Sequence, residues 1–163
     1  MAAANERFVE AARGLGMEPE YQTYPDGTRT AVDAAAAVGC DVGQIVKSLV
    51  FMGDDKPVLA LTSGANRVDT KLLAAAAGVA KIRQANADQA REATGFAIGG
   101  TPPFGHPSSL VTLIDQDLLA WPTVWAAAGT PDTCFPITPD RLVEVANAQP
   151  AVFAEGSDPG AGP

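Results

Sequence analysis

Hydrophobic residues along the chain follow two periods, one typical of helices and one typical of strands. Apolar positions three or four residues apart predict helices over residues 5–15, 31–39, 70–78, 87–95 and 139–149. Alternating or continuous short apolar runs predict strands over residues 18–24, 45–52, 57–63, 79–84, 110–114, 123–128 and 133–137. Helices and strands are therefore interspersed along the whole chain.

Residues that cap helices support these boundaries. Thr30 with Asp33 and Asn86 with Gln89 have the spacing of capping boxes, and Asp69 is a good N-cap for the helix that follows it. The sequence Pro25-Asp26-Gly27 predicts a turn before the second helix.

The segment 45–52 (IVKSLVFM) is the best strand candidate and contains a lysine, Lys47. Both of its alternating faces are apolar, which predicts a central strand covered on both sides. A buried ammonium must find an anion, lose its proton or reach water. Lys47 is thus either a side chain that extends to solvent or pairs with a carboxylate, or a cation directed at an anionic ligand or a developing oxyanion.

A turn over residues 53–56 predicts that the strand 57–63 pairs with the strand 45–52. This pairing brings Thr62 and Ser63 close to Lys47. Their hydroxyls either line a pocket or satisfy backbone groups at the strand end.

The octapeptide GGTPPFGH, residues 99–106, combines three glycines, two prolines and the only histidine of the chain. Glycine permits close approach of a ligand and proline fixes the backbone, so the N–H groups of this loop point in set directions. The loop suits a carboxylate, a carbonyl oxygen or a sugar edge. The alternative is that the loop is only a stiff connection between two secondary-structure elements.

Composition and charge exclude several classes of protein. A chain of 163 residues with 47 % hydrophobic residues is the size of one domain with a real core. No apolar run approaches the ~20 residues that cross a bilayer, and the N-terminus lacks the apolar segment of a signal peptide. Cys40 and Cys134 are isolated, which argues against a zinc site or a disulfide framework and favours a reducing cytoplasm.

The net charge of −8 argues against broad binding to nucleic-acid backbone, DNA included. One segment departs from this balance, because five bases stand against two acids between Arg67 and Arg91. This segment is either a solvated face or a small patch that contacts phosphates.

Several catalytic motifs are missing from the sequence. It has no GxGxxG after a strand, no Walker A lysine and no GxSxG. What remains is one lysine on an apolar strand, nearby hydroxyls and a rigid loop of backbone donors. Such a site polarises and positions a substrate but lacks an obvious strong base.

The segments IVKSLVF, PVLALTSGANRVDTKLLAAAAG, KIRQA and TGFAIGGTPPFGH together resemble the YbaK/EbsC family, which is related to the editing domain of bacterial prolyl-tRNA synthetase. The resemblance covers roughly residues 20–148. It implies a single α+β domain over residues 1–155, with a strongly curved mixed sheet close to a partly open barrel and flanking helices. It also implies hydrolysis of the ester that joins a wrong, small amino acid to the tRNA 3′ end, without metal or other cofactor. Separately, the composition of the segment 156–163 (GSDPGAGP) predicts a disordered tail.

The resemblance places the family's lysine at Lys47, which we predict to be catalytic. The substrate-binding residues predicted from the strand pairing and the loop are Thr62, Ser63, Gly99, Gly100, Thr101, Pro102, Phe104, Gly105 and His106. Several family members have Ser-Pro where this chain has Pro102-Pro103, and His106 has no family role that we can assign, so the amino-acid specificity stays open.

Three functions are compatible with the sequence. The first is a trans-editing aminoacyl-tRNA deacylase, which contacts the tRNA 3′ end weakly and works with a synthetase or another partner. The second is a module of the same fold that binds an aminoacyl-adenosine or the tRNA end without hydrolysis. The third is an interaction domain that retains only the fold. The presence of Lys47 and of an intact Gly/Pro loop makes this third function the least favoured.

Overall fold

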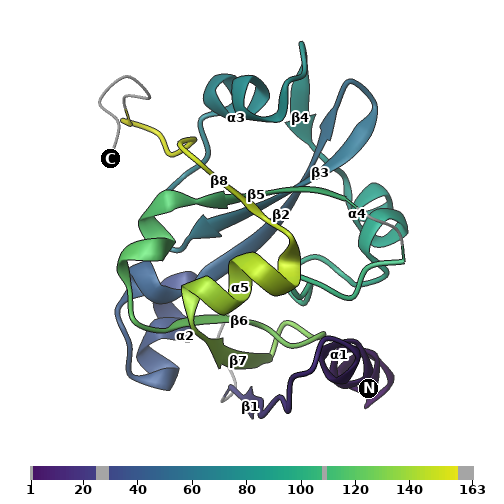
Figure 1. Cartoon of the computed structure of the whole chain (residues 1–163), viewed down its shortest axis with the longest axis vertical. Coiled ribbons are helices and arrows are strands. Elements are labelled where there is room, and N and C mark those ends of the chain that lie inside the picture. The colour runs from purple at the N-terminus through teal and green to yellow at the C-terminus, as the bar shows by residue number, and fades with distance from the viewer. Residues whose placement is uncertain (1, 25–29, 108–109, 158–163) are drawn as a thin grey trace.

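The structure is a computed structural model that describes residues 2–24, 30–107 and 110–157 (Figure 1). The α-helices of these residues are α1 (Ala2–Gly14), α2 (Ala31–Val38), α3 (Thr70–Ala77), α4 (Ala87–Thr94) and α5 (Pro139–Ala146). The strands are β1 (Gln22–Thr23), β2 (Val46–Gly53), β3 (Lys56–Ser63), β4 (Ile82–Gln84), β5 (Val111–Asp115), β6 (Val124–Ala127), β7 (Thr133–Ile137) and β8 (Gln149–Ala151). Two short 3-10 helices span Val42–Gln44 and Gln116–Ala120.

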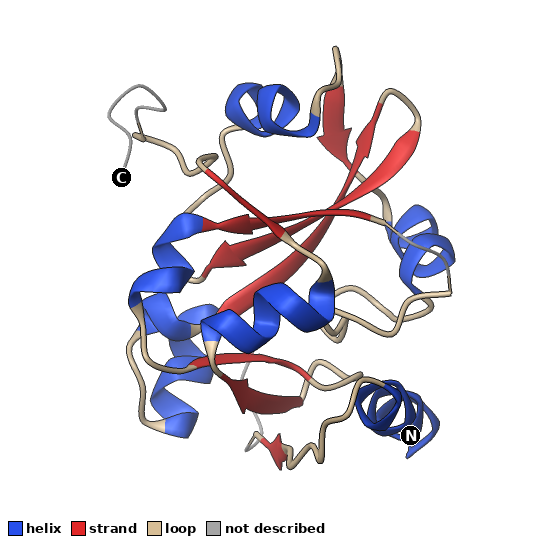
Figure 2. Cartoon of the chain, in the orientation of Figure 1, coloured by secondary structure: helices blue, strands red, loops and turns tan. Residues whose placement is uncertain are grey.

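The strands form two sheets with helices around them (Figure 2). A five-stranded sheet has the order β4-β2-β3-β5-β8, and a three-stranded sheet has the order β1-β7-β6. In the larger sheet β2 is antiparallel to β3 and β4, whereas β5 is parallel to β3 and β8. A single bridge between Ile45 and Trp125 joins the two sheets. The predicted α+β fold with a mixed sheet is confirmed, and the strands do not close into a barrel.

The five-stranded sheet is buried on both faces, as the apolar pattern of β2 predicts. One face packs against α1, α4, α5 and the three-stranded sheet, with Val50 and Leu59 in its core. The other face packs against α3 and Phe153, with Phe51 and Val58 in its core. Alternate residues of one strand therefore enter two separate cores.

The predicted helix caps are present. The Thr30 side chain accepts a hydrogen bond from the Asp33 N–H, and Asn86 and Gln89 form a reciprocal capping box. Asp69 accepts hydrogen bonds from two N–H groups at the start of α3. These caps satisfy backbone donors that have no partner inside the helix.

The β2–β3 hairpin confirms the predicted pairing. Asp54 and Asp55 form a two-residue turn with φ of 49° and 67°, the left-handed geometry that matches the twist of a hairpin. The register that follows places Lys47 opposite Thr62 and Val46 opposite Ser63. A local turn has thus fixed contacts sixteen or so residues apart.

The last helix is shorter than the spacing predicts. Asn147, with φ of 49°, closes α5, and its N–H bonds to the carbonyls of Val143 and Glu144. Gln149 was expected on the helix but begins β8, which pairs with β5. The strands predicted over 18–24 and 79–84 are also shorter, with two and three residues.

Some predictions fall outside the described residues. The Pro25-Asp26-Gly27 turn does so, and so does the greater part of the tail predicted to be disordered, residues 158–163. Within the described part of the chain, no helix has the length and apolar character to cross a membrane.

Candidate functional site

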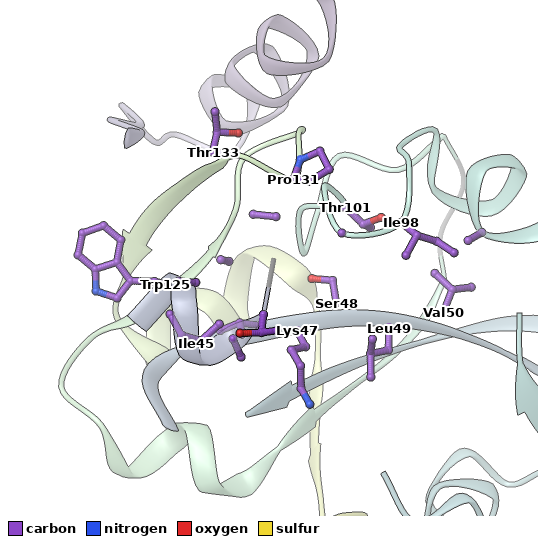
Figure 3. A pocket seen from close by; sticks show the side chains of 18 of the residues that line it. Ile45, Lys47, Ser48, Leu49, Val50, Ile98, Thr101, Trp125, Pro131 and Thr133 are labelled. Carbon is purple, nitrogen blue, oxygen red and sulfur yellow. The ribbon is translucent and has the colours of Figure 1, made fainter. Parts of the chain in front are cut away.

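A cavity of about 500 Å³ lies between β2, β6 and the Gly/Pro loop (Figure 3). Its lining is mostly small and apolar, with hydroxyls and one lysine among it. The lining residues that matter below are Tyr24, Lys47, Ser48, Thr101, Trp125 and Pro131.

Over residues 46–50 the cavity lies along an edge of β2 with which no strand among the described residues pairs. β2 pairs with β3 along its whole length but with β4 only over Phe51–Gly53. The opposite edge of the segment 46–50 is bounded by the Ile45–Trp125 bridge at one end and by the Ala85 N–H bond to the Val50 carbonyl at the other. In an antiparallel strand the N–H and C=O of one residue point to the same side. Because Val50 directs its carbonyl away from β3, Ser48 directs its N–H and C=O toward this free edge.

Ser48, which also lines the cavity, has an unpaired hydroxyl. Its Oγ is buried and is the one buried side-chain nitrogen or oxygen without a hydrogen-bond partner among the described residues. Figure 3 shows this side chain on the same side of β2 as Thr101 and Pro131. A hydroxyl buried without a partner costs about 1–3 kcal/mol, so this position is unfavourable until something else supplies the bond.

Lys47 lines the same cavity as Thr101, as the sequence predicts, but its ammonium turns away from that loop. Its side chain leaves the other face of β2 (Figure 3), and its Nζ donates a hydrogen bond of 2.7 Å to the Asn66 carbonyl. Burial and the nearby Arg67 lower the pKa of Lys47, and Asp115 opposes this shift. The ammonium is thus half-buried and held at the end of β3.

Asp115 organises the polar cluster around Lys47. It is 1 % exposed, and its carboxylate accepts hydrogen bonds from the Ser63 N–H, the Asn66 side-chain amide and the Asp117 N–H. The same Asn66 amide also donates to the Asp117 carboxylate. Every partner in this cluster that faces the Asp115 carboxylate is a donor, so the charge is well satisfied.

The Gly/Pro loop is held from behind by its own backbone and by the segment 129–133. The Gly100 N–H and the Thr101 hydroxyl both donate to the Ala97 carbonyl. A Cβ on Gly100 would lie 2.7 Å from the Thr130 Cα, so only glycine fits there. The loop therefore presents Gly99 and Thr101 to the cavity in a fixed position.

His106 fastens the far end of this loop. Its Nε2 lies 2.9 Å from the Pro102 carbonyl, which only accepts, so Nε2 carries the hydrogen. Burial lowers the pKa of His106, and the bond to Pro102 opposes this shift in part. The ring is thus placed to hold the loop.

The structure brings three of the predicted site residues to the cavity, namely Lys47, Gly99 and Thr101. The others lie elsewhere: Thr62, Ser63, Gly100, Pro102, Phe104, Gly105 and His106 do not line it. The Thr62 and Ser63 hydroxyls bond to the carbonyls of Ala60 and Gly43, as expected for residues that satisfy a strand end. Phe104 packs between Phe8 and Phe135, with ring centroids 5.6 and 5.8 Å away. Aromatic packing, and not ligand contact, explains its position.

Sequence reasoning did not single out Ser48, Tyr24 or Trp125 as lining residues. Tyr24 and Trp125 come from segments far from the loop in sequence and reach the cavity through the three-stranded sheet. Burial and a hydrogen bond with Cys134 raise the pKa of Tyr24, so its hydroxyl keeps its proton. The sequence does contain a signal for Ser48, because it is the polar residue on the apolar face of β2 opposite Lys47.

The sequence profile of the aminoacyl-tRNA editing domain matches residues 25–145, which include β2, the cavity loop and most of α5. This chain belongs to the aminoacyl-tRNA editing domain family. The predicted resemblance to the YbaK/EbsC proteins is thereby confirmed.

Relatives in this family differ in how they carry the editing domain. YwhH of Bacillus subtilis (strain 168), an uncharacterized protein, is 30 % identical over 128 residues, which are 78 % of this chain and 81 % of YwhH. EbsC of Enterococcus faecalis, provisionally named a Cys-tRNA(Pro)/Cys-tRNA(Cys) deacylase, is 28 % identical over 91 % of this chain and 89 % of EbsC. The proline–tRNA ligase of Geobacter sp. (strain M21) is 29 % identical over 80 % of this chain but only 24 % of the ligase.

A solved structure agrees over nearly the whole molecule. A crystal structure provisionally described as a trans-editing enzyme for prolyl tRNA synthetase is 44 % identical and superposes with a TM-score of 0.90, covering 96 % of this chain and 99 % of that one. The editing-domain family and this fold support the predicted enzyme class, an aminoacyl-tRNA deacylase that acts in trans.

Proposed function

We propose that this protein hydrolyses the ester between a small, wrongly attached amino acid and the 3′-terminal adenosine of a tRNA. The small side chains around the cavity, among them Ala85, Ala90 and Ala126, suit a small aminoacyl group. Selection between amino acids that differ by one methylene is worth only ~1–3 kcal/mol at a single site, which is why a second, hydrolytic site is useful.

The unpaired Ser48 hydroxyl is the observation that carries this proposal. A buried hydroxyl without a partner is rare in a native protein, and the residue that carries it lines the cavity together with Thr101. A bound ester offers carbonyl, amino and sugar groups that complete its hydrogen bonding. The free N–H and C=O of Ser48 offer two further bonds at the same edge.

The chemistry needs little beyond positioning, because an aminoacyl ester is already activated. Water adds to the ester carbonyl, the C–O bond to the ribose breaks, and the ribose oxygen leaves with a proton. Backbone N–H groups of the loop stabilise the negative charge on the carbonyl oxygen. A substrate hydroxyl, or a thiol if the amino acid is cysteine, relays the proton: it accepts one from the attacking water and gives its own to the leaving ribose oxygen.

Lys47 supplies positive charge to this reaction. To do so, its side chain leaves the Asn66 carbonyl and swings around the free edge of β2. The hydrogen bond that it gives up is worth about 1 kcal/mol net, a small barrier compared with the attraction to a developing oxyanion.

Contact with tRNA alone is weak and depends on salt, because the net charge of the protein is −8. A synthetase that has just released its product is a natural partner, and the cytoplasm, where tRNA is charged, is the natural compartment. Nanomolar affinity for uncharged tRNA at physiological salt would contradict this part of the proposal.

The decisive experiment incubates the protein with tRNAPro charged with alanine, serine, cysteine or proline, and measures release of the amino acid. We expect release of at least one small amino acid and retention of proline. Lys47→Met is the test variant, and Lys56→Met, at an exposed position of the same hairpin, is the matched control. No release from any charged tRNA would overturn the proposal.

The orientation of Lys47 favours a second candidate, a module that binds the aminoacyl end without hydrolysing it. With the ammonium on Asn66, no group of the cavity acts as an evident catalyst. This function predicts that charged tRNA binds more tightly than uncharged tRNA while the ester survives, which the same incubation distinguishes.

A further inference from the structure

A second hollow, which we call the basic groove, borders β4, the strand whose residue Gln84 also lines the cavity. It has a volume of about 730 Å³ and is lined by Lys71 of α3, Lys81, Arg83 of β4, and Asp54 and Asp55 of the hairpin turn. Figure 1 shows α3, β4 and this turn at one end of the long axis of the molecule, opposite α1.

The three cations of the groove stand out in an acidic protein. The chain has 11 basic and 19 acidic residues, yet Lys71, Lys81 and Arg83 are all exposed around one hollow. They belong to the segment Arg67–Arg91, where the sequence carries its excess of positive charge.

The acids of the groove have different roles. The Asp54 carboxylate accepts hydrogen bonds of 3.1 and 3.0 Å from the N–H groups of Ala80 and Lys81, which lower its pKa. It fastens the hairpin to the loop before β4 and is partly neutralised there. Asp55, exposed at the tip of the turn, is a negative charge at the rim of the groove.

The groove and the cavity both border β4. β4 is the edge strand of the five-stranded sheet, and its successive residues Arg83 and Gln84 line the groove and the cavity respectively. Because Gln84 lines the cavity and Arg83 the groove, a polynucleotide whose last nucleoside lies in the cavity can pass β4 and reach the basic groove.

We propose that the basic groove binds phosphates of the tRNA acceptor end, upstream of the terminal adenosine. Arg83 is oriented for this by bonds from its Nη1 to the side-chain oxygen of Gln89, at 3.0 Å, and to the Gln84 carbonyl. Lys71 of α3 and Lys81, directly before β4, add charge to the lining of the same groove. This inference rests on the proposed function for the identity of the RNA, but the contact itself is measurable without catalysis.

The test measures binding of an uncharged acceptor-stem RNA hairpin by fluorescence anisotropy between 50 and 200 mM salt. Replacing Lys71, Lys81 and Arg83 together by Gln removes three phosphate contacts. We expect binding to weaken roughly tenfold or more at the lowest salt, and the slope of log K against log salt to fall by about 2–3. Arg13→Gln, an exposed charge on α1, is the control and leaves both quantities unchanged.

Asp55→Asn is the complementary variant, because it removes a negative charge from the rim. Asparagine tolerates the left-handed conformation of Asp55, so the turn is kept. We expect tighter binding of the hairpin, about twofold to fivefold at low salt.

Outcomes for the groove and for the catalytic proposal are separable. Hydrolysis of 3′-aminoacyl-adenosine, which lacks phosphates, is unchanged in the triple variant if the groove only holds RNA. Equal hairpin affinity and equal salt slope in the triple variant and the wild type overturn the groove, whatever the deacylase assay shows. Absence of ester hydrolysis with intact, groove-dependent hairpin binding overturns the catalytic proposal alone.

Discussion

Lys47 and Ser48 are neighbours on β2, yet the hydrogen bonding of their side chains is opposite. Lys47 carries a charge and is held on one face of the sheet by the Asn66 carbonyl, beside the Asp115 cluster. Ser48 is neutral and lies on the other face, with a buried hydroxyl that has no partner in the described part of the chain. The face of β2 with Lys47 has its polar groups hydrogen-bonded and stabilises the fold. The face with Ser48 has a hydroxyl without a partner, and a ligand can supply the missing hydrogen bond.

A polar residue on an apolar strand can have its hydrogen bonds supplied by the fold, as Lys47 does, or left for a ligand, as we infer for Ser48. A buried charge is so costly that the fold must provide for it, so its presence alone does not reveal a ligand. Burying a hydroxyl without a hydrogen-bond partner costs less free energy than burying a charge, so a fold can tolerate it. The lack of a partner then indicates a place where a ligand can bind. Four variants test the contrast between these faces.

Lys47→Met has the largest expected effect on activity. If the ammonium reaches the developing oxyanion, its loss lowers deacylation by roughly 10²–10³-fold. The fold persists, because methionine fits the apolar face and removes a partly buried ammonium. Single-turnover deacylation and thermal melting are measured together. A variant that keeps its activity ends the catalytic role, and one that fails to fold assigns Lys47 to the structural cluster.

Asp115→Asn tests whether the Lys47 face is structural. The asparagine amide meets donors on Ser63, Asn66 and Asp117 with a donor of its own, so at least one hydrogen bond to a charged group is lost. We expect the free energy of unfolding to fall by about 1.5–3 kcal/mol in urea titrations. Unchanged stability would show that this cluster does not support the fold.

Ser48→Ala tests the other face of β2, and we expect it to lower activity without lowering stability. Removing an unpaired hydroxyl leaves stability unchanged or slightly raised, while kcat/KM falls about fivefold through the loss of one hydrogen bond of ~1 kcal/mol. Ser63→Ala is the matched control, because its hydroxyl is bonded to the Gly43 carbonyl at 2.9 Å and its loss lowers stability. If Ser48→Ala destabilised the protein as much as Ser63→Ala, the Ser48 hydroxyl would have a partner in solution.

The smallest expected effect concerns the loop above Ser48. Because burial lowers the pKa of His106, the unfolded chain binds this proton more tightly than the folded protein does. Stability from His106 is therefore full above its usual pKa of about 6.5 and is lost as pH falls toward the lowered value. Melting of wild type and His106→Gln between pH 7.5 and 5 isolates this contribution. Parallel curves for the two proteins would contradict it.

Local signals in the sequence predicted much of this protein. The caps at Thr30, Asp69 and Asn86 need only neighbouring residues, and all three are present. The hairpin turn needs four residues, and it fixed the Lys47–Thr62 register. The motif around Lys47 and the Gly/Pro loop was specific enough to indicate the editing-domain family.

Features that depend on distant pairing were not predictable. β8 is a three-residue strand of Gln-Pro-Ala that exists because β5 offers it an edge. The shortness of β4 leaves the edge of β2 free beside the cavity, and nothing in the sequence of β2 indicates this. The loop residues Phe104 and Gly105 lie against α1, some ninety residues away in sequence, so their structural roles were hidden.

The sequence by itself determined which residues alternate on β2, where helices begin and end, and to which family the chain belongs, because these depend on local stereochemistry and local motifs. Only the tertiary structure decided which face of β2 is hollow, where the Lys47 ammonium rests and which hydroxyl lacks a partner. These depend on how two sheets and the loop pack together. A period of two shows that Lys47 and Ser48 lie on opposite faces, but it carries no information on what covers either one.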